Sequence, residues 1–512
     1  IRRPPRSTPS NSSAASDVYK RQKIDRIIVV GLLGLAVWLI LLGRLFITQI
    51  ANADEYRSRA RRQHQRKRVV KAPRGLVFDR DNVVLAKNIP ALDFWTERDA
   101  IVNIDRVDSA FATVLGLEPG YIKNRIRNSR TNWLYLARGV ELSKGRKLRF
   151  LEKDSVFSTE CFARVYPLGR DAGQLIGFID PDGKGLEGIE HTYDRQLSGT
   201  DGEVIVLSDQ AGRDYRLFQY GSKPPIPGHD IHLTIDADLQ RIVESELAES
   251  IVESCRADGG MAVFMRPSTG EILAMACYPA FSPENYAESD PEHRKMRVIT
   301  DIYEPGSTFK IVTFSALLAT DKFDPEETVD CEWGEWFFCD DTIHDAEPHG
   351  KITAREVLIH SSNIGTIKLA QRLPKDTLYS YARAYGFGNP TGIDLSGEVG
   401  GILHKPYKWS GMTPAAFPMG HEVAGTAIQI ATAYGALANR GILVQPYLVD
   451  RITHRNGSEI YKHEPVSVRR VIEEADADTL CELMKTVVDS GTGIRENTRI
   501  IGRGKNRNRA EG

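Results

Sequence analysis

The hydrophobic positions of the chain change pattern along its length, and the first pattern is one long apolar run. Residues 27–43 are uncharged and almost wholly apolar, and the run continues past Arg44 to Ile47. This is roughly the length that a helix needs to cross the hydrocarbon core of a bilayer. No small-residue cleavage site follows, which favours a retained anchor over a cleaved signal peptide. The pattern predicts one transmembrane helix within residues 23–50.

A mixed pattern punctuated by glycine follows the anchor and ends near Pro227. Residues 73–82 have the pattern of a strand that enters a tight turn, and residues 83–86 predict a second strand. Nothing in this region combines an acid, a base and a nucleophile at a useful spacing. We therefore expect residues 51–227 to form a mixed α/β scaffold domain.

From Gly228 onward the pattern predicts strands and then helices. The first predicted elements are a strand, an amphipathic helix and the two strands of a hairpin, at residues 232–236, 238–255, 261–265 and 271–277. Helical periodicity dominates from Ser307 to about Arg440, and a further helix ends near Asp489. This order is typical of an α+β domain in which helices cover a sheet. We place this domain at residues 228–505.

Composition narrows the classes of protein without naming one. A length of 512 residues with 41% hydrophobic content fits two or three packed domains. The formal net charge of -1 gives no overall field that would attract nucleic acid. The six cysteines form no C-x-x-C pair and no zinc-ligand spacing with histidine, so we expect neither a metal nor a cofactor. Cys331 and Cys339 are compatible with a disulfide in an oxidising compartment and equally with free thiols.

The strongest chemical signal is the segment from Ser307 to Lys310, which follows Pro305-Gly306. If the segment is helical, residues three apart share a face, and Lys310 lies beside the Ser307 hydroxyl. Apolar surroundings can lower the pKa of a lysine until its neutral amine accepts the serine proton. By itself, however, Ser-x-x-Lys is more often an N-cap serine followed by a surface lysine. The interpretation as a nucleophile and its base needs a second element.

That second element is Ser361-Ser362-Asn363, which follows the apolar run at residues 357–359. On its own it reads as a cap or a turn. Beside Ser307 and Lys310, it supplies a hydroxyl that can relay a proton and an amide that can bind both the N–H and the C=O of a peptide. Ser-x-x-Lys together with such a Ser-x-Asn element is the pattern of the penicillin-interactive serine acyltransferases.

On these motifs the chain resembles the class B penicillin-binding proteins, the monofunctional D,D-transpeptidases of bacterial cell-wall synthesis. The resemblance runs from the anchor to the C-terminus. It is carried by Arg74-Gly75 with Asp79-Arg80, Arg164 to Pro167, Gly185 to Glu190 with Leu197-Ser198-Gly199, Leu233 to Asp236, Gly270 to Met275, Tyr303 to Lys310, Ser361 to Gly365, Gly386-Phe387-Gly388 with Thr391-Gly392, and Ala433-Tyr434 with Ala438-Asn439. The short link from Gly177 to Asp180 and the Glu304 before Pro305 are more similar to the septal, division-specific branch than to the elongation branch.

The resemblance implies a fold and a reaction. The fold would be α+β and multidomain, with one N-terminal transmembrane helix, a non-catalytic pedestal and a transpeptidase domain. Ser307 would attack the penultimate D-Ala carbonyl of a stem pentapeptide, and β-lactams would trap the same serine. Lys310 would activate Ser307 and Ser361 would shuttle a proton. Asn363 would hold the substrate amide.

The resemblance also implies a location and partners. The anchor would cross the bacterial cytoplasmic membrane once, with the catalytic domain on the extracytoplasmic side. The ligands would be stem peptides that end in D-Ala-D-Ala, and β-lactams. The pedestal would dock a polytopic membrane glycan polymerase and division proteins.

The third family motif, Lys-Thr-Gly-Thr, is where the chain departs from the pattern. This motif supplies a cationic clamp for the substrate carboxylate and an oxyanion-hole N–H. The chain instead reads Gly504-Lys505-Asn506-Arg507 and ends at Gly512. A coding sequence for this tail exists in which deletion of one adenine restores Gly-Lys-Thr-Gly-Thr-Ala-Gln-Lys in the adjacent frame. We therefore expect Lys505 to be the substrate-binding lysine of the motif.

Both ends of the chain carry further expectations. Residues 506–512 would be a frameshifted tail, which leaves the transpeptidase domain without its C-terminal strands. Residues 1–22 are rich in Ser, Arg and Pro and would be a non-native or disordered leader. A catalytically inactive penicillin-binding scaffold or β-lactam sensor, which keeps the serine but lacks the clamp, stays open as the alternative function. A serine β-lactamase is disfavoured, because such enzymes are single soluble domains without a pedestal.

Overall fold

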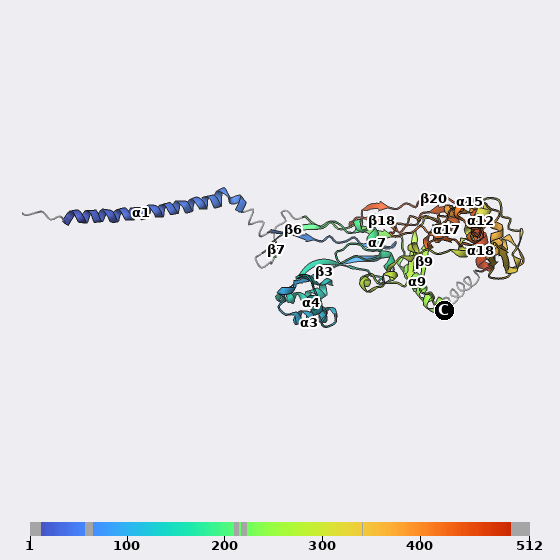
Figure 1. Cartoon of the computed structure of the whole chain (residues 1–512), viewed down its shortest axis with the longest axis horizontal. Coiled ribbons are helices and arrows are strands. Elements are labelled where there is room, and N and C mark those ends of the chain that lie inside the picture. Colours follow the sequence, from blue (N-terminus) through green and yellow to red (C-terminus); the bar gives the residue numbers. More distant parts are fainter. Residues whose placement is uncertain (1–11, 57–64, 209–213, 217–222, 340, 493–512) are drawn as a thin grey trace, which may run out of the picture. The chain divides into compact units, whose positions relative to one another are not determined.

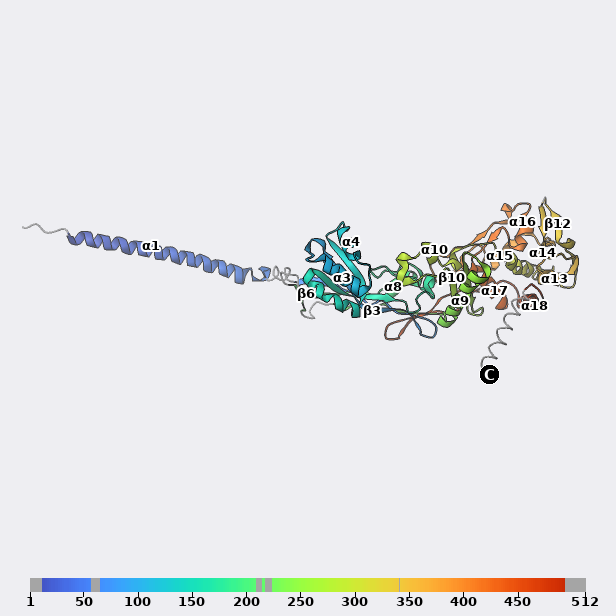
Figure 2. The ribbon, with the colours of Figure 1, turned by 90° about the horizontal axis from the view of Figure 1, so that it is seen from below.

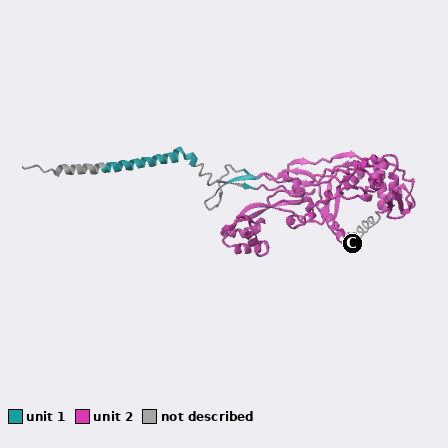
Figure 3. Ribbon diagram, viewed as in Figure 1, with its two compact units in different colours: residues 1–70, 201–224 teal, residues 71–200, 225–512 magenta. Residues whose placement is uncertain are grey.

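The computed structural model describes residues 12–56, 65–208, 214–216, 223–339 and 341–492. These residues separate into two units, drawn in different colours in Figure 3. Unit 1 comprises residues 1–70 and 201–224, and unit 2 comprises residues 71–200 and 225–512.

Unit 1 contains the apolar helix expected near the N-terminus. Helix α1 (Ser12–Phe46) continues into a π-helical turn, η1 (Ile47–Ala51) (Figure 1). The 26 residues of Arg26–Ala51 are long and apolar enough to cross a membrane, and no part of their apolar window is buried. Three strands complete the unit as an antiparallel sheet in the order β1-β6-β7, at Gln65–Val70, Gly202–Ser208 and Asp214–Arg216.

A seven-stranded sheet runs through unit 2. Six strands follow the order β19-β18-β8-β2-β3-β4, and β5 also pairs with β3. Their bounds are Glu459–Lys462, Val449–Thr453, Asp230–Leu233, Val77–Phe78, Val84–Glu97 and Trp133–Glu141, with β5 at Val156–Val165. All pairs are antiparallel except β2 with β8. The sheet joins strands on both sides of the boundary that we predict at residue 227.

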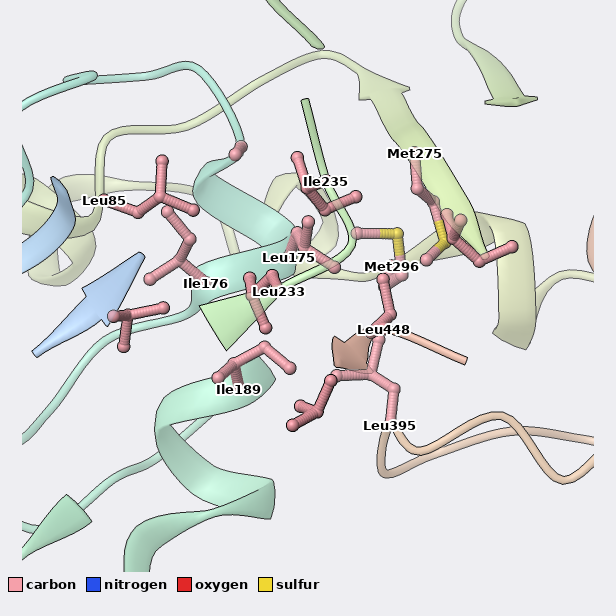
Figure 4. Close-up of a cluster of buried hydrophobic side chains, with 14 of the residues drawn as sticks. Leu85, Leu175, Ile176, Ile189, Leu233, Ile235, Met275, Met296, Leu395 and Leu448 are labelled. Carbon is pink, nitrogen blue, oxygen red and sulfur yellow. The ribbon is translucent and has the colours of Figure 1, made fainter. Parts of the chain in front are cut away.

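The largest buried cluster of unit 2 also joins both sides of that boundary. Figure 4 shows Leu85, Leu175 and Ile189 gathered with Ile235 and Leu448, and all five are fully buried. Leu175 and Ile189 come from two short helices, α6 (Gly173–Ile176) and α7 (Gly188–Thr192). Each fully buried side chain of this size stabilises the fold by roughly 1.5–3 kcal/mol. The predicted pedestal and transpeptidase domains therefore share an apolar core.

A second core forms where three helices pack against the part of β3 that contains Leu92 and Phe94. Helix α3 (Ile104–Leu115), helix α4 (Tyr121–Arg127) and the 3-10 helix η3 (Arg146–Asp154) contribute to it. Phe94 of β3 meets Phe111 of α3 edge to face, with ring centroids 5.5 Å apart. Asn103 accepts a hydrogen bond from the Arg106 N–H and so caps α3.

The third core lies inside a lobe of helices, here called the helical lobe, which carries the candidate site (Figure 2). Its helices are α12 (Lys310–Leu318), α13 (Ala354–Ile359), α14 (Asn363–Ala370), α15 (Lys375–Ala384), α17 (Ala427–Ala438) and α18 (Glu474–Ser490). The predicted hairpin is present as β9 (Gly260–Met265) and β10 (Ile272–Tyr278). The predicted helix before it is present as α9 (Ala237–Glu249), extended by the π-helical turn η4 (Ser250–Cys255).

The stretch predicted to be mainly helical also contains short paired strands. They are β11 (Thr328–Asp330) with β14 (Lys351–Thr353), β12 (Glu335–Phe338) with β13 (Asp341–His344), and β15 (Ile402–Leu403) with β16 (Val423–Ala424). Strands of two to four residues are too short for an alternating pattern to stand out in the sequence.

Candidate active site

The turn that carries Ser307 and Lys310 is helical, as the sequence predicts. Gly306–Phe309 forms a 3-10 turn, η6, which leads directly into α12. Side chains three residues apart eclipse one another in a 3-10 helix, so Ser307 and Lys310 lie on one face. Ser307 is exposed, whereas Lys310 is 1% exposed. Phe309 anchors the turn, because its ring packs edge-on against Phe387 and Phe417.

A second segment fixes the approach to Ser307. The Gly306 N–H donates to the carbonyl of Gly420, 3.1 Å away, and a methyl group on Gly420 would lie only 2.1 Å from the Gly306 oxygen. Gly420 also has φ +84, so both the close approach and the backbone conformation require glycine there. Glu304 adds a second connection, because its carboxylate accepts from the Glu422 N–H at 2.9 Å and contacts His421 Nδ1 at 2.8 Å.

Ser361 lies between two helices and faces Ser307. A capping box of Thr353 and Glu356 begins α13, which ends just before His360, and Ser362 caps the start of α14. Ser361 joins the two helices with φ +55, in the left-handed region that few non-glycine residues occupy. Its hydroxyl donates to Ser307 Oγ, 3.0 Å away.

Lys310 Nζ completes the series of contacts. It donates to the Ser361 carbonyl at 2.6 Å, to Ser361 Oγ at 3.0 Å and to Asn363 Oδ1 at 3.1 Å. All three acceptors are neutral. Burial lowers the pKa of Lys310 from 10.5 to about 8, because removal from water disfavours the ammonium form, and the more distant Asp345 carboxylate opposes this shift. Lys310 can therefore lose its proton near neutral pH.

Asp345 belongs to the candidate site by its contacts, although the sequence does not single it out. Its carboxylate accepts the backbone N–H groups of Asn363 and Ile364 and the hydroxyl of Ser362. The preceding residue contributes as well, because the His344 carbonyl accepts from Asn363 Nδ2 at 3.0 Å. A helix N-terminus needs acceptors for its free N–H groups. That requirement is the only signal in the sequence, and it does not name the residue.

The structure brings together four of the five predicted site residues: Ser307, Lys310, Ser361 and Asn363. Their catalytic and binding roles stay predictions. Lys505 and the predicted tail at 506–512 lie outside the described residues. Both Cys331 and Cys339 are free thiols, and the buried Cys331 sulfur accepts from the Ser362 hydroxyl at 3.3 Å.

Two parts of the chain match known protein families. Residues 260–505 match the penicillin binding protein transpeptidase domain, and residues 69–233 match the penicillin-binding protein dimerisation domain. Stage V sporulation protein D of Bacillus subtilis strain 168 is 31% identical over 477 residues, which cover 91% of this chain and 73% of that protein. The chain belongs to the class B penicillin-binding proteins.

Other relatives and solved structures agree with the family. The peptidoglycan D,D-transpeptidase FtsI of Escherichia coli K12 is 29% identical over 459 residues, 88% of this chain and 75% of that protein. Penicillin binding protein 3 of Mycobacterium tuberculosis in complex with aztreonam is similar with a TM-score of 0.60 and 27% identity, over 82% of this chain and 76% of that chain. The predicted α+β penicillin-binding fold is confirmed by these matches.

Proposed function

We propose that this penicillin-binding protein is a peptidoglycan D,D-transpeptidase that works through a serine acyl-enzyme. The observation that carries the proposal is the hydrogen-bonded series Lys310 Nζ, Ser361 Oγ and Ser307 Oγ, in which each step is 3.0 Å. The series connects a base of lowered pKa to an exposed hydroxyl. The printed activity of the FtsI relative supports the same reaction class.

Acylation follows from this geometry. The neutral Lys310 amine takes the Ser361 proton while Ser361 takes the proton of Ser307, and the Ser307 oxygen attacks the penultimate D-Ala carbonyl carbon. The peptide bond to the terminal D-Ala then breaks. The proton on Lys310 returns through Ser361 to the departing amine. An ester between Ser307 and the donor stem peptide remains.

Crosslinking reverses the proton path. The amine of a neighbouring stem peptide attacks the ester carbonyl and gives its proton through Ser361 to Lys310. The ester bond breaks, and Ser307 regains a proton from the same route. Asn363 holds the donor amide, and before acylation the Lys505 cation binds the carboxylate of the terminal D-Ala, which leaves with that residue. β-Lactams mimic D-Ala-D-Ala and stop the reaction at the acyl-enzyme.

We assign the wider setting of the reaction on the same basis. Residues 23–50 anchor the chain in the bacterial cytoplasmic membrane, with the catalytic domain on the extracytoplasmic side, where the substrate lies. Residues 51–227 form the pedestal that docks a glycan polymerase and division partners, and residues 228–505 form the transpeptidase domain. The two family matches support this division. The Glu304 before Pro305 and the FtsI relative favour a septal role.

Covalent labelling tests the proposal directly. We expect the full-length protein encoded by the gene to be labelled by a fluorescent penicillin, and Ser307→Ala to remove the label. Ser109→Ala on α3, an exposed serine in the predicted pedestal, serves as the matched control and should label normally. Persistent labelling of Ser307→Ala would place the nucleophile elsewhere. Labelling without crosslinked product from donor and acceptor stem peptides would favour a β-lactam sensor over an enzyme.

A further inference from the structure

The hairpin of β12 and β13 presents one face to the protein and one to solvent. Successive side chains of a strand point to opposite faces. Trp336, Phe338 and Ile343 pack with Ile364 and Ile367 of α14 in a small core. The opposite face carries Glu335 paired with His344, and Phe337 paired with Thr342. Phe337 is 70% exposed on this outer face.

Trp333, just before the hairpin, is exposed in an unusual way. Its side chain is 76% exposed, and a methyl group on Gly350 would lie 3.1–3.5 Å from three atoms of the indole. The ring therefore lies over Gly350 and is otherwise open to solvent. Trp333 also has φ +54, directly after Glu332 with φ +52. Such a conformation is strained for a bulky residue, and strain of this kind concentrates at ligand clamps.

The base of the hairpin is tied to the candidate active site. The Asp345 N–H donates to the Gly334 carbonyl at 3.0 Å, next to Trp333. Asp345 and His344 in turn hold the backbone and side-chain amide of Asn363, which contacts Lys310. The exposed Trp333 therefore directly precedes the residue that is hydrogen-bonded to the loop holding the Asn363 amide.

The substrate has a part for which this surface is suited. A stem pentapeptide is attached to an amino sugar of the glycan strand at the end away from D-Ala-D-Ala. Fully extended, five residues span about 17 Å, so the sugars lie well away from the nucleophile. Trp333 and Phe337 are four residues apart, at most about 14 Å along the chain, so one short length of glycan can reach both.

We propose that Trp333 and Phe337 form a stacking platform for the amino-sugar rings of the glycan strand that carries the donor stem peptide. The proposal rests on the transpeptidase function proposed above. The apolar faces of sugar rings stack on open aromatic rings, and the Glu335 carboxylate on the same outer face as Phe337 can accept hydrogen bonds from sugar hydroxyls. This carboxylate disfavours an anionic membrane surface. Polar residues between the two aromatic side chains disfavour a continuous apolar protein interface.

The test compares two donor substrates of the full-length protein. One is a free pentapeptide, and the other is the same pentapeptide on uncrosslinked glycan strands. The measured quantity is kcat/KM for the glycan-borne pentapeptide divided by kcat/KM for the free pentapeptide. This ratio does not depend on the fraction of active protein. For Trp333→Ala and for Phe337→Ala we expect this ratio to fall roughly tenfold, the size of one lost aromatic contact. Tyr121→Ala, an exposed aromatic on α4, should leave the ratio unchanged.

Two further variants separate binding from folding. Trp333→Gly relieves the positive φ, so we expect an unchanged or higher unfolding temperature together with the same fall in the ratio. Gly350→Val retains the indole but displaces it, and we expect a smaller fall. An unchanged ratio in Trp333→Ala and Phe337→Ala overturns the glycan platform. Failure of the wild-type protein to be acylated by penicillin would instead overturn the proposed function, so the two failures are distinguishable.

Discussion

Unit 2 contains buried cationic side chains in the predicted pedestal and in the helical lobe, and the hydrogen-bond acceptors of the two differ in charge. In the predicted pedestal, Arg74 and Arg164 both donate to Glu190, at 2.6 and 2.7 Å, and the Glu190 side chain is fully buried. Arg74 also donates to Asp194 at 2.7 Å. In the helical lobe, Lys310 is as deeply buried, but its three acceptors are a carbonyl, a hydroxyl and an amide.

The two environments move the pKa of the cation in opposite directions. Burial acts to lower the pKa of Arg74, but the Glu190 and Asp194 carboxylates outweigh it, and the pKa is raised. For Lys310 burial dominates, and the pKa falls to about 8. The Arg74 guanidinium does not lose its proton in proteins, and its carboxylate partners stabilise the charged form further, so this cation serves structure. A buried cation with neutral partners can give up its proton and serve as a base.

The largest effect should come from making the active-site cation permanent. Lys310→Arg keeps a positive charge on a long side chain, but a guanidinium does not lose its proton in proteins. Since general base catalysis contributes about 10²–10⁴ in rate, we expect the second-order rate of penicillin acylation to fall about 10³-fold. Stopped-flow or gel-based labelling measures this rate. Lys375→Arg, at an exposed position of α15, is the control and should acylate normally. A fall of less than tenfold would show that Lys310 does not act as the base.

The second effect should come from removing charge at the pedestal network. Glu190→Gln leaves two buried guanidinium groups without their shared carboxylate, and breaking a buried ion pair typically costs about 3–5 kcal/mol. We expect the free energy of unfolding, measured in urea, to fall by about 3 kcal/mol while the acylation rate per folded molecule stays constant. Asp182→Asn removes the largely exposed partner of Arg138 and should cost under about 1 kcal/mol. Equal losses for the two variants would contradict the role of burial.

Local spacing was enough to predict part of this site. Ser307 and Lys310 are three residues apart, and one helical turn brings them together whatever the rest of the chain does. The hairpin at β9 and β10 and the helix α9 were predicted for the same reason, because their patterns lie within a few residues of each other. The acyl-transfer chemistry required one further element, the Ser-x-Asn sequence at residues 361–363.

What the sequence could not supply are contacts between distant segments. The Asp345 carboxylate reaches Asn363 across 18 residues, and Arg74 reaches Glu190 across 116. Strand β18 pairs with β8 across more than two hundred residues. Strand β2, from the other side of residue 227, also pairs with β8, which gives the predicted pedestal and transpeptidase domains a common sheet. Tertiary packing sets these contacts, and neither periodicity nor spacing encodes them in a readable way.

The pH dependence of acylation should reveal the lowered pKa of Lys310, with a smaller change in rate than Lys310→Arg causes. Neutral Lys310 is the reactive form, so the rate should rise with pH through a limb near the pKa of about 8 and then level off. For such a pKa about a tenth of the lysine is neutral at pH 7 and about nine-tenths at pH 9, a rise of about ninefold. Labelling rates between about pH 6 and pH 10 measure the limb. A limb near the ordinary lysine value of 10.5 would mean that burial does not tune the base.

The smallest effect should come from Asp345, whose carboxylate acts on Lys310 by its charge and without a direct hydrogen bond to Nζ. The charge of Asp345 raises the pKa of Lys310, so Asp345→Asn should move the limb to lower pH. The asparagine retains an acceptor oxygen for the N–H groups of Asn363 and Ile364, so the position of the motif should be preserved. At pH 7 more of the lysine would be neutral, and we expect the acylation rate to rise about twofold to fourfold.

Asp345→Ala separates this charge from the hydrogen bonds. It removes the same charge, so its limb should move in the same direction, but it also removes the acceptors at the start of α14. The plateau rate at high pH should therefore fall for Asp345→Ala and hold for Asp345→Asn. If Asp345→Asn instead moved the limb to higher pH, Asp345 would not act on Lys310 as a negative charge. Burial alone would then set the pKa of Lys310, because no carboxylate would restrain its fall, and the contrast with the carboxylate-bound Arg74 would be larger.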